Sequence, residues 1–204
     1  MLKIAVLGST RGTDLQYIID AIESGRLKNA EISAAISNKK DAGILEKARK
    51  YNIAAVFIDS SGKSREEFDK EIIRILEKNG VELVLLIGYM RFISKPFVEK
   101  YRNKIMNIHP SLLPAFAGGM DKNVHAAILE HGCKVTGCTL HFVDEGADTG
   151  PIVVQKATSI EEDDTVDSLK EKVQKLEGEA LVEGIELFRD KKLKIKGRVV
   201  HILR

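Results

Sequence analysis

Two residues near the middle of the chain could stabilise charge on a reacting group. Asn107 and His109 lie two residues apart in the segment Asn107-Ile108-His109-Pro110-Ser111, so in an extended strand their side chains share a face. Pro110 favours that geometry, because the residue before a proline is driven out of the helical region. An amide and an imidazole aimed at one point could hold a developing oxyanion. Taken alone, this segment is more typical of a histidine that satisfies a structural hydrogen bond.

A second polar segment is the acidic loop 144–150, which reads DEGADTG. Gly146 and Gly150 would let the backbone turn tightly around Asp148. Pro151, which follows, can begin a strand only where no ladder donor is needed. Calcium binding is a weak interpretation, because a calcium loop usually has more oxygen ligands at alternating spacing. A solvated surface turn is the simplest interpretation of the loop by itself.

A glycine-containing turn, residues 8–14 (GSTRGTD), follows the first predicted strand. Its glycines and the first N–H groups of the next helix could bind a phosphate. The spacing G-x-x-x-G matches neither the dinucleotide fingerprint nor a P-loop, and Asn38 ends the second strand where an acidic residue would bind a ribose. Phosphate binding and a tight turn with Asp14 as the helix cap are therefore equal alternatives.

Residues 88–93 (GYMRFI) follow the most apolar predicted strand. Aromatic, thioether and guanidinium groups at that position would line a crevice suited to a flat, partly charged ligand. The alternative is that the segment only covers the core and leaves Arg91 exposed.

The elements that would position these groups follow from hydrophobic spacing. Crowded β-branched residues predict buried strands, and apolar residues at three- and four-residue spacing predict helices between them. The predicted strands are 4–7, 32–36, 54–58, 81–87, 104–108, 136–143 and 151–158, and the predicted helices are 14–24, 42–51, 65–78, 96–101, 123–131 and 166–189. We expect residues 194–203 to form an edge strand or a hairpin, and Asn123 to cap the predicted helix 123–131.

Alternating strands and helices in the first half indicate a parallel sheet with right-handed crossovers. We therefore expect one α/β domain over residues 1–204. It would have an open, mostly parallel Rossmann-like sheet, helices on both faces and a C-terminal antiparallel extension.

Composition excludes several classes of protein. The 204 residues include 32 Lys+Arg and 30 Asp+Glu, a net charge of +2, and 44% are hydrophobic. This balance excludes collagen-like and disordered chains, and it leaves no basic stripe for nucleic acid. No apolar stretch approaches the roughly 20 residues that span a bilayer. We expect a cytoplasmic protein that binds small molecules, without nucleic-acid or membrane partners.

Neither the cysteines nor the histidines predict a metal site. Cys133 and Cys138 lie five residues apart, which is neither a redox CxxC pair nor part of a zinc set, so we expect reduced, packed thiols. His125 and His131 lie six apart in a predicted helix and therefore on different faces, and His141 stands alone in a strand. We expect these histidines to be structural.

Taken together, separated motifs resemble those of the folate-dependent formyltransferase family. The first is residues 107–114 (NIHPSLLP); the later ones are residues 141–143 (HFV) and 148–151 (DTGP). They occur in the family's order, with the glycine-containing turn and the segment 88–91 in the expected places. The resemblance runs from Ile4 to about the end of the long helix.

The resemblance implies a reaction in purine biosynthesis. The amine of glycinamide ribonucleotide would attack the formyl carbon of 10-formyltetrahydrofolate, with no metal required. His109 would stabilise and then protonate the tetrahedral intermediate, and Asn107 would donate a second hydrogen bond to the same oxygen. Asp148 would pair with His109, favour its charged form, and hold a water that relays the proton.

The resemblance also implies two binding sites. Gly12, Thr13 and Asp14 would hold the substrate phosphate, and Glu177 would meet the substrate's glycine end. The folate site would use Arg65 toward the glutamate tail, with Met90, Arg91, Phe92, Ile93 and Asn107 around the pterin.

This chain departs from the family's usual pattern at three places. Asp14 stands where Asn is frequent, Gly178 where His is often found, and the loop from Ala117 to Asp121 lacks a usual proline. Two other functions stay open: a formyltetrahydrofolate hydrolase of the same fold, and a nucleotide-binding module without catalysis. A monomer and a homodimer are equally compatible with the sequence.

Overall fold

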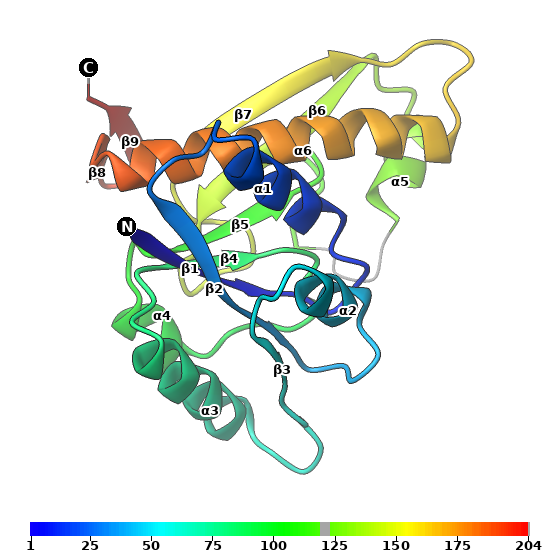
Figure 1. Ribbon diagram of the computed structural model, residues 1–204. Coiled ribbons are helices and arrows are strands. Elements are labelled where there is room, and N and C mark those ends of the chain that lie inside the picture. Colours follow the sequence, from blue (N-terminus) through cyan, green and yellow to red (C-terminus); the bar gives the residue numbers. More distant parts are fainter. Residues whose placement is uncertain (119–122, 204) are drawn as a thin grey trace.

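The computed structural model describes residues 1–118 and 123–203, and its framework is one nine-stranded sheet (Figure 1). The strand order is β3-β2-β1-β4-β5-β6-β7-β9-β8. The strands are β1 Leu2–Leu7, β2 Ala30–Ser37, β3 Ala55–Phe57, β4 Leu83–Leu86, β5 Ile105–His109, β6 Val135–Phe142, β7 Ile152–Ser159, β8 Leu193–Lys196 and β9 Val199–Ile202. Strands β1 to β5 are parallel, and β6 runs antiparallel to both of its neighbours. The predicted, mostly parallel sheet is confirmed.

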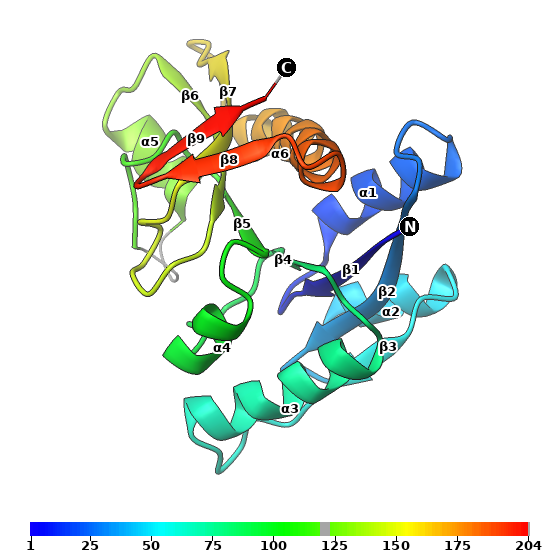
Figure 2. The same ribbon diagram turned by 90° about the vertical axis from the view of Figure 1, so that its left-hand side faces the viewer.

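The C-terminal segment forms a hairpin, which resolves the choice left open by the sequence. Strands β8 and β9 are antiparallel, and β9 joins the sheet beside β7 through the pair Ile152 and Val199. Figure 2 shows this hairpin lying next to α6, against which Leu193 and Ile195 pack.

Helices cover both faces of the sheet, as predicted (Figure 1). They are α1 Thr13–Glu23, α2 Gly43–Lys50, α3 Arg65–Lys78, α4 Lys95–Lys100, α5 Val124–Glu130 and α6 Val166–Arg189. Alternate residues of β1 point to opposite faces: Ile4 and Val6 pack with α1, α2 and α6, whereas Ala5 and Leu7 pack with α3 and α4. Burying each of the larger apolar side chains stabilises the fold by roughly 1.5–3 kcal/mol.

The helix ends confirm most of the predicted capping but not all of it. The Asn123 side chain caps α5 by accepting a hydrogen bond from the Ala126 N–H at 3.2 Å. Helix α1 instead begins after Gly12, whose left-handed φ of 66° needs a residue without a Cβ, and no side chain caps it. The alternative in which Asp14 caps this helix is therefore wrong. Asp14 lies inside the first turn and is buried.

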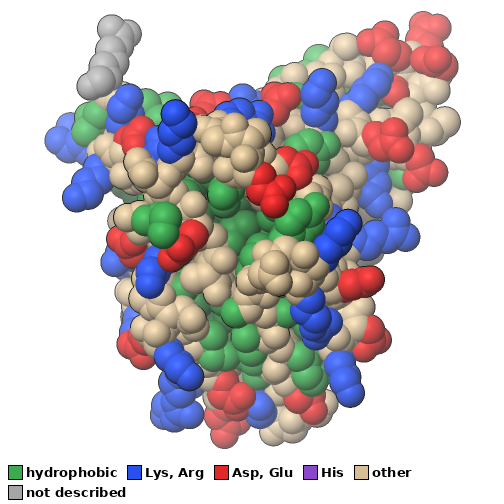
Figure 3. Space-filling model, viewed as in Figure 1, with side chains coloured by type: hydrophobic (Ala, Val, Ile, Leu, Met, Phe, Trp, Pro, Cys, Tyr) green, Lys and Arg blue, Asp and Glu red, His purple; other side chains and the backbone are tan. Residues whose placement is uncertain are grey.

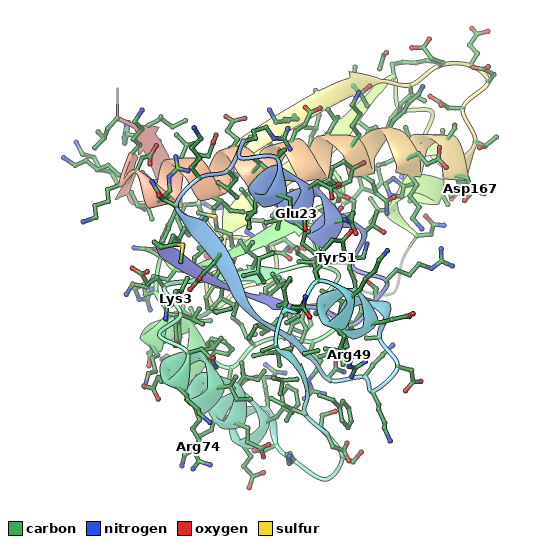
Figure 4. All side chains as sticks on the ribbon, in the orientation of Figure 1. Lys3, Glu23, Arg49, Tyr51, Arg74 and Asp167 are labelled. Atoms are coloured by element: carbon green, nitrogen blue, oxygen red, sulfur yellow. The ribbon has the colours of Figure 1, made fainter. Side chains whose placement is uncertain are left out.

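The surface matches the even charge of the sequence. On the face shown in Figure 3, blue and red side chains are interspersed rather than gathered into one basic patch. Figure 4 shows Tyr51 at the end of α2, facing α1, where its hydroxyl lies 2.8 Å from the Gln16 amide nitrogen that donates to it. Within residues 1–118 and 123–203, no helix combines the length and apolarity needed to cross a membrane.

Candidate active site

The polar residues of the first motif lie at the carboxyl end of β5, the edge where open α/β sheets place ligands. Asn107 is half-buried and His109 is buried, with 6% of its surface exposed. Strand β6 runs antiparallel to β5, and its residue His141 pairs with Asn107 in the register. The antiparallel pairing therefore brings a second imidazole beside Asn107.

The acidic loop brings Asp148 onto this strand edge. Asp148 has a left-handed φ of 55°, a conformation that Asp tolerates better than most residues. Gly150 lies close to the end of β6. A Cβ at position 150 would be 1.8 Å from the Phe142 carbonyl oxygen, so only glycine fits there. The tight turn expected around Asp148 is present, and it points the carboxylate at the two histidines.

Asp148 joins the groups of the site. Its Oδ2 lies 3.4 Å from His109 Nδ1, and its Oδ1 lies 3.6 Å from His141 Nε2. The Gly118 N–H donates to Oδ2 at 2.9 Å, and the Asn107 amide donates to Oδ1 at 3.4 Å. The structure thus assembles all three predicted catalytic residues, Asn107, His109 and Asp148, around one carboxylate.

His141 is the residue that the sequence interpretation missed, since we expected it to be only structural. Its Nδ1 lies 2.8 Å from the Phe142 carbonyl oxygen, which can only accept, so Nδ1 carries a proton. In the neutral ring Nε2 then accepts from the Asn107 amide, 3.1 Å away. The signal that could have found it is the cross-strand register of β5 and β6, which places residues 107 and 141 side by side.

The environment shifts the pKa values of the Asp148 and His109 side chains in physically distinct ways. The close contact with His141, together with the Gly118 N–H and the nearby His109, lowers the pKa of Asp148 to about 2 against the opposing effect of burial. Burial lowers the pKa of His109, and it outweighs the raising effect of Asp148. The expected pairing exists, but it does not hold the ring charged: His109 is neutral near pH 7.

The other ring nitrogen of His109 is available for chemistry. In the described part of the chain, Nε2 is buried and has no hydrogen-bond partner. A buried polar atom without a partner is rare and costly unless a ligand or water completes it. With Nδ1 facing Asp148, the neutral ring presents Nε2 as a proton acceptor.

One side of Asn107 and Asp148 opens into a cavity of about 320 Å³ that we call the arginine cavity. Its walls include the predicted folate residues Arg65, Arg91, Phe92 and Ile93, together with Tyr89 and the loop 143–148. Met90 does not line it; the Met90 N–H donates to Ser9 Oγ at 3.0 Å and ties this segment to the glycine-containing turn.

A buried carboxylate on α3 supports the wall of the arginine cavity. Asp69 Oδ2 accepts from the Ser94 N–H at 2.5 Å, at the start of α4. Arg91 stacks on Phe68, with the guanidinium carbon 4.6 Å from the ring centroid. The segment therefore covers the core and also presents Arg91 to the cavity; Arg91 is half-buried, so the alternative in which it is left exposed is wrong.

Beyond Ile108 and Pro110, on the other side of the strand end, lies a second cavity of about 190 Å³, which we call the carboxyl cavity. Three predicted substrate residues line it: Thr13, Asp14 and Glu177. Thr10, Gly88, His125 and Gln174 complete its polar wall. Gly12 precedes this wall as the N-cap of α1, outside the lining.

Glycine at position 88 lets Thr10 pack closely against the wall of the carboxyl cavity. Gly88 has a left-handed φ of 55°, and a Cβ there would lie 2.4 Å from Thr10 Oγ1. Burial raises the pKa of Asp14 to about 7, with Lys47 opposing that rise, and burial next to Asp14 raises the pKa of Glu177. Two carboxyl groups without their usual acidity thus face one cavity.

Metal ligation has no support in the described residues, where no group of three or more histidine, cysteine or acidic side chains could hold an ion. The predicted departure at Ala117 to Asp121 falls largely outside the described residues, which stop at Gly118 and resume at Asn123. Another hollow of about 600 Å³ lies away from this chemistry, between the N-terminus and the C-terminal hairpin.

The open α/β sheet, with polar residues gathered at the carboxyl end of β5, has the architecture of a formyl transferase domain. The formyl transferase family matches residues 2–185, and the chain belongs to that family.

Several proteins similar to this chain are named for purine biosynthesis or for formyl transfer to a ribonucleotide. The trifunctional purine biosynthetic protein adenosine-3 of Gallus gallus is 43% identical over 187 residues, which cover 91% of this chain and 18% of that protein. The chain thus spans only 12% to 18% of the length of the curated relatives it matches. Glycinamide ribonucleotide transformylase 1 from Symbiobacterium toebii has a TM-score of 0.94 at 42% identity, covering 100% of this chain and 95% of that one. Phosphoribosylglycinamide formyltransferase from Coxiella burnetii has a TM-score of 0.91 at 36% identity, covering 98% and 93%.

Proposed function

We propose that this protein transfers the formyl group of 10-formyltetrahydrofolate to the amine of glycinamide ribonucleotide, a step of purine biosynthesis. The similar structures named glycinamide ribonucleotide transformylase and phosphoribosylglycinamide formyltransferase support the choice of the amine substrate, and the relative named for purine biosynthesis agrees with the pathway. The observation that carries the proposal is the pair of His109 and Asp148 at a strand end flanked by two cavities. A bimolecular transfer needs two ligands on opposite sides of one reacting centre.

The His109 ring moves the proton in this proposal. The substrate amine forms a bond to the formyl carbon, and the carbonyl electrons move onto the formyl oxygen. His109 Nε2 takes the proton that the amine loses, and Asp148 stabilises the charged ring that results. The tetrahedral intermediate then breaks its bond to the folate nitrogen, which receives that proton, directly or through a water held by Asp148.

Asn107 supplies a hydrogen bond to the intermediate's oxygen in this scheme. The Asn107 amide nitrogen lies 3.1 Å from His141 Nε2 and 3.4 Å from Asp148 Oδ1, so each of its two hydrogens faces one of these atoms. The longer contact costs less to exchange for an oxyanion. Asn107 thus becomes the donor predicted from the sequence, while its contact with His141 fixes its orientation.

The two cavities receive the two substrates. Arg65 and Arg91 are suited to the carboxylates of the folate tail, and Phe92 and Ile93 to the flat ring. The ribonucleotide enters the carboxyl cavity, with its phosphate at the N-terminus of α1 around Gly12 and Thr13. Met90, outside the cavity lining, contributes through its backbone. We treat residues 1–204 as one formyltransferase domain located in the cytoplasm.

A two-substrate assay tests this function. Purified protein is mixed with 10-formyltetrahydrofolate, with and without glycinamide ribonucleotide, and loss of the formyl group is followed together with the formylated product. We expect turnover only when the amine is present. Formate release at the same rate without the amine would establish the hydrolase instead, and no turnover in either mixture would favour the binding module.

A further inference from the structure

Ser9 lies where the walls of the two cavities meet. It follows β1 and precedes α1, and only 4% of its surface is exposed. Its backbone N–H donates to the Gly88 carbonyl oxygen at 3.0 Å, beyond the ends of the paired strands β1 and β4. The turn of residues 8–14 and the segment 88–93 are therefore already joined through their backbones at this point.

The Ser9 side chain adds a second connection. Its Oγ accepts a hydrogen bond from the Met90 N–H at 3.0 Å and donates one to Asn38 Oδ1 at 2.7 Å. Because the Met90 N–H can only donate, the single hydroxyl hydrogen of Ser9 must point to Asn38. Asn38 stands where a dinucleotide-binding chain has its acidic residue, and here it fixes the direction in which the Ser9 oxygen accepts. We call these two hydrogen bonds the Ser9 bridge.

Met90 is the point at which the segment 88–93 passes from one cavity to the other. Gly88, two residues before it, lines the carboxyl cavity. Residues 91–93, directly after it, line the arginine cavity. A contact that holds the Met90 N–H therefore fixes the backbone where one wall turns into the other.

Close packing of the two turns allows a side chain as short as serine to form this bridge. A Cβ at Gly88 would lie 2.4 Å from Thr10 Oγ1, and a Cβ at Gly8 would lie 2.8 Å from the Ile87 carbonyl oxygen. These two glycines flank the contact from both turns. They let the backbones approach until the Ser9 hydroxyl reaches from one turn to the other.

We propose that Ser9, oriented by Asn38, is a positioning residue for the folate substrate: its hydroxyl holds the Met90 backbone and thereby sets the wall of the arginine cavity, although Ser9 belongs to the turn of the nucleotide site. This inference rests on the proposed function. In the part of the chain that the structure describes, Ser9 lines neither cavity, so its effect on a ligand passes through Met90.

The arrangement predicts different effects on the two substrates. Without the Ser9 hydroxyl, the Met90 N–H loses its acceptor, and residues 91–93 lose the contact that positions them. One neutral hydrogen bond corresponds to roughly a 3- to 10-fold change in an equilibrium constant, so the dissociation constant for tetrahydrofolate should rise by that factor. The backbone bond from Ser9 to Gly88 remains, so the affinity for the ribonucleotide should stay near that of the wild type.

Amide hydrogen exchange of the ligand-free protein tests the Ser9 bridge itself. The Met90 N–H should exchange faster in Ser9→Ala and in Asn38→Ala than in the wild type. Ser33→Ala is the matched control, because the Ser33 hydroxyl on β2 also donates a hydrogen bond, to the Ile4 carbonyl oxygen at 3.0 Å. The control should leave the Met90 exchange rate unchanged. Equal Met90 exchange in Ser9→Ala and the wild type would overturn the bridge.

Isothermal titration with tetrahydrofolate, and separately with glycinamide ribonucleotide, tests the positioning role. Ser9→Ala and Asn38→Ala should each weaken folate binding, and the double variant should weaken it no more than Ser9→Ala, because both residues act through one hydrogen-bonded path. Asn38→Asp keeps an acceptor oxygen and should restore most of the affinity that Asn38→Ala loses. Ser33→Ala should bind both substrates like the wild type.

The outcomes separate this inference from the proposed function. Additive losses in the double variant, or a larger loss of ribonucleotide binding than of folate binding in Ser9→Ala, would refute the positioning role. A Ser9→Ala variant that binds tetrahydrofolate as tightly as the wild type would refute it as well. A wild type that binds neither substrate would instead contradict the proposed function, while the exchange rates still decide whether the Ser9 bridge exists.

Discussion

His109 Nδ1 and Asp148 Oδ2 lie 3.4 Å apart, although α5 and β6 lie between the two residues in the chain. His109 ends a strand of the parallel half of the sheet, and Asp148 belongs to the turn between two antiparallel strands. The site therefore exists only where the two halves of the sheet meet.

Asp148→Asn should change stability in a pH-dependent way. Asparagine tolerates the left-handed backbone, so the change removes charge and little else. Because the folded state lowers the pKa of Asp148 to about 2, its ionised form stabilises the fold above the unfolded pKa, by about 2 kcal/mol. That contribution is lost as the pH falls from about 4 toward 2. Urea unfolding at pH 7 and pH 2.5 should show a large difference between wild type and variant only at pH 7; equal differences would contradict this account.

His141→Phe should act through its neighbours, because His141 is a positioning residue that contacts Asn107 and Asp148. Losing the histidine raises the pKa of Asp148 and leaves the Asn107 amide without its partner, so kcat should fall on the order of tenfold. In a plot of kcat against pH, the acid limb should move to higher pH. A packing defect alone would not cause that shift. An unchanged pH profile would show that His141 does not tune the site.

Arg91→Ala should weaken folate binding more than ribonucleotide binding, because Arg91 lines the arginine cavity and not the carboxyl cavity. A charge-assisted contact is worth roughly 1.5–3 kcal/mol, so the dissociation constant for folate should rise about 10- to 100-fold. Isothermal titration with each substrate measures the effect. Arg74→Ala, on the exposed side of α3 (Figure 4), is the matched control. The reverse order of effects would overturn the assignment of the cavities.

Asp69→Ala should destabilise the protein by roughly 1–3 kcal/mol, because it leaves the buried Ser94 N–H without an acceptor. Asp69→Asn keeps an acceptor oxygen and should lose less. Thermal unfolding ranks the two variants. Equal stability of Asp69→Ala and the wild type would show that the hydrogen bond between Ser94 and Asp69 does not stabilise the wall of the arginine cavity.

The sheet could be predicted from sequence because its strands are crowded with β-branched residues, and because α3 and α6 show clear apolar spacing. That Asn107 and His109 share a face of one strand could also be predicted, but the segment alone favoured a structural histidine, and only the resemblance to the formyltransferase family paired His109 with Asp148. His141 could not, because its place beside Asn107 depends on the register of an antiparallel pair.

The environment of the Asp14 carboxyl group also could not be predicted from the sequence. A polar residue at the start of a helix looks like a cap, and only the packing of α1 on α6 shows that the carboxyl group turns inward beside Glu177. The charge state of His109 depends in the same way on burial, which outweighs the favourable carboxylate next to it.

The most direct test of the central claim is the rate of formyl transfer by His109→Ala, measured with saturating substrates beside titrations of both ligands. Loss of the proton acceptor should reduce kcat roughly a hundredfold or more while both substrates still bind with unchanged affinity. A variant that folds, binds both substrates and retains a rate near that of the wild type would contradict the account.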